Sequence, residues 1–269
     1  MDKKIKDRVA VISGATSGIG LACANEFYKK GYRVYCLARS KPEDFPYNFV
    51  KCDLTVLDDI KKAVDIILTN EQKIDVLVSN AGMGISGPLE YCTEDEMRRI
   101  FELNLYAGFN LAKEFLPQLK KQGGGKIIFT SSVGSIFPLP FQAFYSASKV
   151  ALETMAKAWR IEVAPFKVDI ACILPGDTKT DFTKNREKNF GGDANDYAGR
   201  DVRSITKMEK DEQKGMMPES VAKVVFKLSQ KRKMPATKIV GFSYKLLNFL
   251  NKILPQRLVL WVVKLMYAK

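Results

Sequence analysis

Tyr145 and Lys149 have the clearest capacity for chemistry in this sequence. They lie four positions apart in a segment whose apolar residues recur at helical spacing, so both side chains should project from one helix face. A tyrosine, whose ordinary pKa is about 10, exchanges protons poorly near neutrality unless its phenolate is stabilised. An ammonium fixed one turn away should lower that pKa, and a positively charged ring bound beside it would lower it further. The spacing therefore predicts a proton-transfer pair.

The absence of histidine narrows the chemistry further. It excludes serine–histidine hydrolysis, H-E-x-x-H metalloproteases and histidine-ligated zinc alcohol dehydrogenases. The five cysteines are widely spaced and contain no C-x-x-C pair, so we predict neither a disulfide framework nor a thiolate zinc site. We therefore expect no metal.

A glycine-rich run predicts a dinucleotide site near the N-terminus. It follows a short apolar stretch and opens a segment of helical period, which is the context in which free N–H groups and the helix dipole meet a pyrophosphate. The residues expected at the phosphates are Gly14, Thr16, Ser17, Gly18, Ile19 and Gly20. Nineteen positions beyond Gly20 stands Arg39, followed by Ser40. Arginine at this place suits the 2′-phosphate of NADP better than the free ribose of NAD, so we predict NADP.

The elements that must position these residues alternate between apolar β-branched runs and helical segments. The runs are residues 9–13, 33–38, 76–79, 126–131, 168–174 and, more weakly, 238–240. Short, nearly continuous apolar runs are typical of parallel strands covered on both faces. With 269 residues and no internal repeat or linker, the chain is predicted to be one α/β domain.

In its motifs the sequence resembles the classical short-chain dehydrogenase/reductase family over about residues 7–242. The glycine motif T-G-x-x-x-G-x-G has serine, Ser13, at its first position, and Ser79 replaces the first asparagine of N-N-A-G. The other matches, in chain order, are Asp53-Leu54, Asn80-Ala81-Gly82, Asn104, Ser132, Tyr145 with Lys149, and Pro175-Gly176. The resemblance implies a Rossmann-type doubly wound parallel sheet of about seven strands in the order 3-2-1-4-5-6-7, with helices on both faces.

The resemblance also implies a role for each matched residue. Tyr145 would exchange a proton with the substrate oxygen while a hydride passes between substrate carbon and nicotinamide. Ser132 would hydrogen-bond the same oxygen, Lys149 would hold the nicotinamide ribose, and Asn104 would fix a water in a proton relay. Asp53 and Leu54 would contact adenine, and Asn80, Ala81 and Gly82 would border the coenzyme. Pro175, Gly176, Thr178 and Thr180 would bracket the carboxamide end of the nicotinamide ring.

Apolar residues beside this chemistry point to a bulky hydrophobic substrate. Phe137, Leu139, Pro140 and Phe141 are expected to form a stiff wall, and the polar segment 182–217 to form a substrate lid. Our leading interpretation is an NADP-dependent hydroxysteroid dehydrogenase acting on a steroid or bile acid. The competitors are reductases of acyl-dihydroxyacetone-phosphate, 3-keto sphingoid bases or retinoids.

The segment 243–269 is expected to be a basic, amphipathic helical extension beyond the catalytic domain 1–242. Its apolar block is too short for a spanning helix. Two alternatives remain open for it: contact with an anionic membrane surface, and packing against the substrate pocket or a partner subunit. We see no secretory signal and expect a cytoplasmic protein, peripheral at a membrane under the first alternative. Family resemblance suggests a homodimer or homotetramer.

Two further classes compete with an enzyme. An NADP-binding redox sensor without turnover would show damage to the Ser/Tyr/Lys set, and none is visible. A nucleic-acid binder is suggested only by the net charge of +13, and no binding motif supports it. We therefore expect no nucleic-acid partner.

Overall fold

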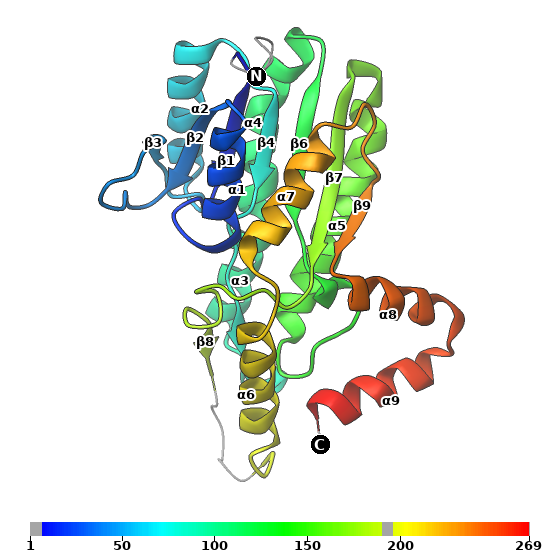
Figure 1. Cartoon of the computed structure of the whole chain (residues 1–269). Coiled ribbons are helices and arrows are strands. Elements are labelled where there is room, and N and C mark those ends of the chain that lie inside the picture. Colours follow the sequence, from blue (N-terminus) through cyan, green and yellow to red (C-terminus); the bar gives the residue numbers. More distant parts are fainter. Residues whose placement is uncertain (1–6, 190–195, 269) are drawn as a thin grey trace.

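The computed structural model describes residues 7–189 and 196–268, so residues 190–195 of the expected lid and both chain ends lie outside it. Seven strands form one parallel sheet in the order β3-β2-β1-β4-β6-β7-β9 (Figure 1). They are β1 (Val9–Ser13), β2 (Arg33–Ala38), β3 (Asn48–Lys51), β4 (Val76–Ser79), β6 (Gly125–Thr130), β7 (Val168–Pro175) and β9 (Thr237–Val240). Counted along the chain within this sheet, the order is 3-2-1-4-5-6-7. The predicted fold class is confirmed.

The strands that were predicted most clearly are those whose residues are covered on both faces, whereas β9, predicted only weakly, is an edge strand in which only Val240 is buried. All residues of β1 and β4 are buried, and this double cover requires the continuous apolar runs seen in the sequence. Strand β3 escaped prediction because it is an edge strand in which only Val50 is fully buried. An edge strand needs no continuous apolar run, so its signal in the sequence is weak.

Helices cover both faces of the sheet. One face packs against α1 (Gly18–Lys29) and α7 (Pro218–Ser229), with Phe27 buried between them and the strands. The other face packs against α2 (Leu57–Glu71), α4 (Ala107–Lys121) and α5 (Ala143–Val163), around Phe115 and Phe129. The two hydrophobic layers fix the strands, and therefore the ends of the strands, in one arrangement.

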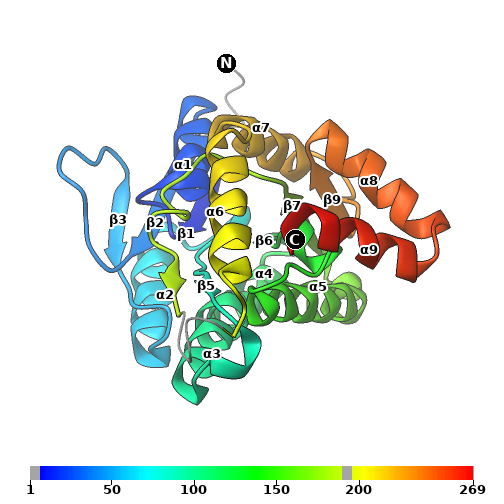
Figure 2. The same cartoon turned by 90° about the horizontal axis from the view of Figure 1, so that it is seen from below.

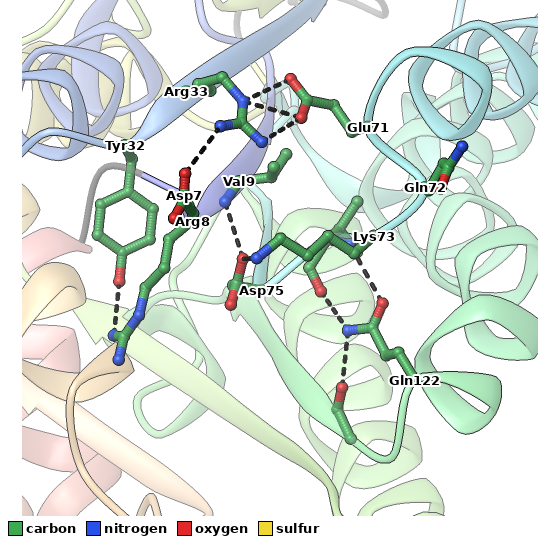
Figure 3. A network of polar contacts seen from close by, with 12 residues as sticks. Asp7, Arg8, Val9, Tyr32, Arg33, Glu71, Gln72, Lys73, Asp75 and Gln122 are labelled. Carbon is green, nitrogen blue, oxygen red and sulfur yellow. Dashed lines mark hydrogen bonds and ion pairs between the residues drawn. The ribbon is translucent and has the colours of Figure 1, made fainter. Parts of the chain in front are cut away.

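Polar contacts secure the amino end of the sheet (Figure 3). The backbone N–H of Val9 donates to Asp75 Oδ2 at 2.8 Å, and Arg33 Nε donates to Glu71 Oε2 at 2.8 Å. Arg8 Nη1 donates to the Tyr32 hydroxyl at 3.2 Å. These bonds tie the start of β1 and β2 to the segments that precede β4 and follow α1.

Shorter elements gather below the carboxyl ends of the strands. They are the small sheet of β5 (Ile85–Ser86) and β8 (Glu187–Lys188), α3 (Glu94–Phe101), a π-helical turn at Glu102–Tyr106 and α6 (Arg200–Gln213). Single 3-10 turns occur at Leu89–Tyr91, Val133–Ser135 and Ala164–Phe166. Within the expected lid segment, α6 and β8 are therefore ordered elements of the fold.

The C-terminal segment forms two helices, α8 (Phe242–Ile253) and α9 (Gln256–Tyr267), as the amphipathic pattern predicted. Figure 2 shows α9 returning toward α6 at the carboxyl end of the sheet. Arg200 Nη2 of α6 donates to the Ala268 carbonyl at 2.9 Å, and Lys207 Nζ lies 5.7 Å from the centre of the Tyr267 ring. No helix in the described part of the chain is long and apolar enough to cross a membrane.

Candidate active site

A cleft of about 1230 Å³ opens at the carboxyl ends of the strands, and almost all the predicted site residues line it. These are Gly14, Thr16, Ser17, Gly18, Ile19, Arg39, Ser40, Asp53, Leu54, Asn80, Ala81, Gly82, Ser132, Tyr145, Lys149, Pro175, Gly176, Thr178 and Thr180. Two predicted residues, Gly20 and Asn104, do not line the cleft but lie against residues that do, Gly14 and Gly82. The fold thus brings together side chains that lie as much as 166 positions apart, from Gly14 to Thr180.

The glycine turn has the close backbone packing that a dinucleotide site requires. Gly14 and Gly18 adopt left-handed φ angles of 61° and 52°, which favour glycine. A Cβ on Gly20 would lie 2.1 Å from the Gly14 carbonyl oxygen, so no side chain fits there. Gly20 therefore acts by letting helix α1 approach the turn, and the N-terminus of α1 faces the cleft.

Ser13 and Asn80 join the glycine turn to the end of β4. Ser13 Oγ accepts hydrogen bonds from the backbone N–H groups of Asn80, at 2.9 Å, and Ala81, at 3.3 Å. A serine hydroxyl makes these contacts without the threonine methyl group, which explains why the departure from the family motif leaves the turn intact. Ser79 is buried against Gly108, where a Cβ would come within 2.8 Å of its hydroxyl, so this position supports the packing of α4.

At one end of the cleft, Arg39 and Ser40 are exposed directly after strand β2. The Asp53 carboxylate accepts hydrogen bonds from the backbone N–H and hydroxyl of Thr55, at 3.0 and 2.7 Å, and these bonds lower its pKa, with a smaller contribution from Arg39. Asp53 is held in place, whereas the Arg39 guanidinium faces the cleft. This end therefore carries a cation available to an anionic ligand.

At the other end, Ser132 lies beside Tyr145 and acts to lower the pKa of its phenol. Ser132 Oγ accepts from the Gly134 backbone N–H at 3.0 Å, which orients it toward the phenol. Burial raises the pKa of Tyr145 and outweighs the lowering by Ser132. In the protein without coenzyme, desolvation of the phenolate is thus the larger effect on the tyrosine pKa; the expected lowering, which included the charged nicotinamide ring, stays a prediction.

Lys149 is buried in the same site and points partly away from the phenol. Its Nζ donates to the Thr130 carbonyl at 3.0 Å and lies 5.8 Å from the centre of the Tyr145 ring. Burial lowers the pKa of Lys149 to about 8. The ammonium is therefore costly to keep in the folded protein, and its proton is easily released near neutral pH.

Asn104 lies in the π-helical turn between α3 and α4, a kind of distortion that occurs often at functional sites. Its amide accepts from Met83 N–H at 2.8 Å and donates to Met83 O at 3.0 Å and Ser148 Oγ at 3.1 Å. A Cβ on Gly82 would lie 3.1 Å from Asn104 Oδ1 and 3.4 Å from Lys149 Nζ. Because Gly82 has no side chain, Asn104 Oδ1 and Lys149 Nζ can both approach the backbone at this position.

The turn after β7 is covered by helix α8. Tyr244 packs so closely on Gly176 that a Cβ there would lie 1.9 Å from its ring, and its hydroxyl donates to Asp177 Oδ2 at 2.5 Å. Thr178 Oγ1 donates to the Gly176 carbonyl at 2.8 Å, and Thr180 packs on Gly18. The Pro-Gly turn is thus fixed between the glycine turn and the C-terminal helices.

The apolar wall differs in part from the prediction. Phe137 and Leu139 line the cleft, but Pro140 and Phe141 do not; Phe141 instead packs edge-on against Tyr197, with ring centres 5.5 Å apart. Most of the wall comes from α8 and α9. Its residues are Leu247, Leu250, Leu254, Val259, Val262, Val263 and Met266. The C-terminal helices therefore help to form the cleft, which agrees with the alternative that they pack against the pocket.

The cleft is also lined by polar residues that the motifs did not indicate, among them Gln142, Asp177, Arg186 and Glu212. Burial raises the pKa of Asp177, and the Glu212 charge adds to this effect. Asp177 could have been suspected because it follows the Pro-Gly motif directly. The other three come from the start of α5, the segment after β7 and the end of α6, and no local pattern links them.

Comparison with known proteins agrees with this geometry. The family model for short chain dehydrogenases matches residues 8–190. A 3-ketodihydrosphingosine reductase of Bacteroides thetaiotaomicron is 33% identical over 98% of this chain and 99% of its own. Human 17-beta-hydroxysteroid dehydrogenase type 1 is 32% identical over 65% of this chain and 58% of its own. The crystal structure of a short-chain dehydrogenase from Streptomyces avermitilis has a TM-score of 0.82 at 25% identity, covering 94% of both chains.

The chain belongs to the short-chain dehydrogenase/reductase family. It is an oxidoreductase that acts on alcohol or ketone groups and uses a nicotinamide coenzyme. The cleft fits such a coenzyme, because the side-chain-free surface of Gly14 and Gly18 faces it at the N-terminus of α1.

Proposed function

We propose that this protein reduces the ketone of a long-chain lipid, a 3-keto sphingoid base, with NADPH. The observation that carries the proposal is the apolar wall of α8 and α9, which lines the same cleft as Tyr145. An acyl chain needs such an extended apolar surface. The similarity to the 3-ketodihydrosphingosine reductase supports it, because a match over 98% of the chain includes the α8–α9 segment.

In this proposal the bound coenzyme would supply a hydride to the carbonyl carbon. The side chains of the protein bind the carbonyl oxygen and protonate it. The Ser132 hydroxyl and the Tyr145 hydroxyl both donate hydrogen bonds to the carbonyl oxygen, and Tyr145 transfers its proton to that oxygen as the alcohol forms. Lys149 holds the nicotinamide ribose and stabilises the phenolate left on Tyr145. Its pKa of about 8 suits it to pass a proton toward the tyrosine near neutrality. Asn104 borders the return path for the proton.

The choice of NADPH rests on Arg39. Its exposed guanidinium at the end of β2 stands where the adenosine ribose meets the second strand in a Rossmann fold. Ser40 offers a hydroxyl beside it. A 2′-phosphate would make charge-assisted, bidentate bonds to this arginine.

A hydroxysteroid dehydrogenase, which the sequence motifs ranked first, is the second candidate. The partial match to the human 17-beta-hydroxysteroid dehydrogenase supports it, and Phe137 and Leu139 would pack on a steroid ring. We rank it below the lipid ketone because that match covers only 65% of the chain.

The test compares long-chain 3-keto amino alcohols with steroid ketones, using NADPH and NADH with each. We expect the lipid ketone to be reduced with the higher kcat/KM. Tyr145→Phe should abolish turnover while NADPH still binds, because only the proton donor is lost. Tyr106→Phe, on an exposed side chain outside the cleft, is the matched control. Reduction of steroid ketones alone would overturn the substrate assignment, and a Tyr145→Phe enzyme with most of its rate would overturn the mechanism.

We further propose that the outer face of α8 and α9 rests on an anionic membrane, from which the lipid enters the cleft. Large apolar side chains are exposed there, among them Phe249 at 59%, Ile253 at 61% and Trp261 at 55%. Lys245, Lys252, Arg257 and Lys264 lie on the same two helices, which carry no acidic residue. Apolar side chains interleaved with cations suit an interface with anionic lipid.

Trp261 is one of only two tryptophans, so Trp159→Phe leaves it as a single reporter. Vesicles containing phosphatidylserine should shift its emission to the blue and sediment the protein, less so at high salt. Replacing Phe249 and Trp261 together by serine in the otherwise native chain should abolish sedimentation, whereas Ile161→Ser, on a still more exposed residue of α5, should not. An unshifted emission would refute the proposal. A homodimer or homotetramer stays a prediction, which light scattering would check.

A further inference from the structure

Arg186 is a buried cation whose hydrogen bonds are incomplete. Its side chain is 1% exposed and lines the cleft. Nη2 is paired with Glu212, whereas Nε and Nη1 have no hydrogen-bond partner among the described residues. The guanidinium carbon lies 5.5 Å from the centre of the Phe182 ring, and that ring lies 5.7 Å from the Tyr145 ring. Two nitrogens of Arg186, which together carry three N–H groups, thus make no hydrogen bond in the cleft that holds the reacting phenol, where a buried donor without an acceptor is costly.

Gln142 presents an unused acceptor on another side of the same phenol. It precedes α5, three residues before Tyr145, and it is 2% exposed while lining the cleft. Its Oε1 has no partner, and its Nε2 faces only the sulfur of Met208, at 2.9 Å. Met208 lies one turn before Glu212 on α6, so Gln142 and Glu212 face the same part of the cleft.

The charges around these residues favour a cation. Glu212 accepts from Arg186 and, at 2.6 Å, from the Thr183 hydroxyl, but its two oxygens have lone pairs left for a further donor. Glu209 lies 3.9 Å from Arg186 Nη1, and Asp177 lines the same region. Arg186 pairs with Glu209 and Glu212, and Glu209 also pairs with Lys188 at 2.8 Å; with Asp177 the group has three carboxylates against two cations, although the whole chain carries a net charge of +13. A phosphate ester would be repelled here, whereas an ammonium would be attracted.

We propose that Gln142, Arg186 and Glu212 form a subsite for the polar end of the substrate, a protonated amine with a neighbouring hydroxyl, next to the reacting ketone. The proposal rests on the proposed function, since it assumes a lipid ketone held at Tyr145. The ammonium donates to Glu212 and to Gln142 Oε1, and the hydroxyl oxygen accepts from the free N–H groups of Arg186. The carbonyl then meets Ser132 and Tyr145, and the acyl chain extends along α8 and α9.

The experiment uses three ketones with the same chain length: a 2-amino-1-hydroxy-3-ketone, its N-acetyl derivative and a 3-ketone with neither amine nor hydroxyl. The wild-type enzyme should prefer the free amine over the other two by about tenfold or more in kcat/KM, the size expected for a charge-assisted hydrogen bond. Glu212→Gln and Gln142→Leu should each reduce this preference. Glu219→Gln and Gln213→Leu, on exposed residues outside the cleft, are the matched controls and should keep it.

Equal kcat/KM for the three ketones in the wild-type enzyme would overturn the subsite, while reduction of all three would leave the proposed function standing. If no long-chain ketone is reduced, the proposed function itself fails. Glu212→Gln could fail to fold because Arg186 loses its partner. In that case the kcat/KM values of the wild-type enzyme for the free and the acetylated amine still test the subsite. A preference that survives in both cleft variants would also overturn the assignment.

Discussion

Replacing Lys149 by methionine should make the coenzyme-free protein more stable while it destroys activity. The ammonium is buried, and its pKa falls from the usual 10.5 to about 8. Methionine fills a similar volume and removes the charge. We therefore expect Lys149 to lower the free energy of unfolding of the coenzyme-free protein. Charged groups that are needed for catalysis often have this effect.

The magnitude follows from the pKa. The difference between about 8 and 10.5 corresponds to about 3 kcal/mol lost by folding with a charged Lys149. The substitution also removes the hydrogen bond from Nζ to the Thr130 carbonyl, 3.0 Å long, which contributes about 1 kcal/mol. The net gain should be about 2 kcal/mol at pH 7, which would raise Tm by roughly 4–8 °C for a chain of this size.

The stability difference between the wild-type protein and Lys149→Met should depend on pH, which distinguishes an effect of charge from one of packing. Because the folded pKa lies below the unfolded one, the cost is fully present below pH 8. The cost declines between pH 8 and 10.5, where folded Lys149 has lost its proton while unfolded Lys149 still binds one, and it is gone above pH 10.5, where both are neutral. Urea unfolding of both proteins without coenzyme should thus show a difference at pH 7 that shrinks by pH 9.5. Turnover should fall by more than about a hundredfold.

Lys157→Met is the matched control, since Lys157 lies on the same helix but is half-exposed and paired with Glu153. We expect no gain in stability from it and no loss of turnover. A Lys149→Met protein that is less stable than the wild type at pH 7, or equally more stable at both pH values, would refute the reasoning from burial.

Two further predictions concern the coenzyme end of the cleft. Arg39→Leu should raise KM for NADPH by about 10- to 100-fold and leave KM for NADH nearly unchanged, because only the 2′-phosphate uses the guanidinium; steady-state kinetics with both coenzymes would check this, and an equal rise for both would contradict it. Gly20→Ala should cost about 1–3 kcal/mol of stability and weaken coenzyme binding, because its Cβ would lie 2.1 Å from the Gly14 carbonyl oxygen. Unfolding and NADPH fluorescence titrations would measure both effects, with Gly123→Asn as control, since nothing lies within 4 Å of a Cβ there and asparagine tolerates its φ of 83°.

The features that could be predicted from the amino-acid sequence are those whose signal is local. Strands β1, β2 and β4 were predicted to the residue, because a strand buried on both faces must be a continuous apolar run. The glycine turn could be located because glycine is required by backbone packing between adjacent elements. The four-residue spacing of Tyr145 and Lys149 placed both on one helix face, and both line the cleft.

Features that depend on residues far apart in the chain could not be predicted and became visible in the folded protein. The direction of the Tyr145 pKa is set by how much water the surrounding segments exclude, and spacing says nothing about that. The edge strand β3 needs no apolar run of its own. Gln142, Arg186 and Glu212 come from three segments and line one cleft only because the start of α5, the segment after β7 and the end of α6 lie at one place. Their shared position arises from packing of the whole chain, which no local pattern encodes.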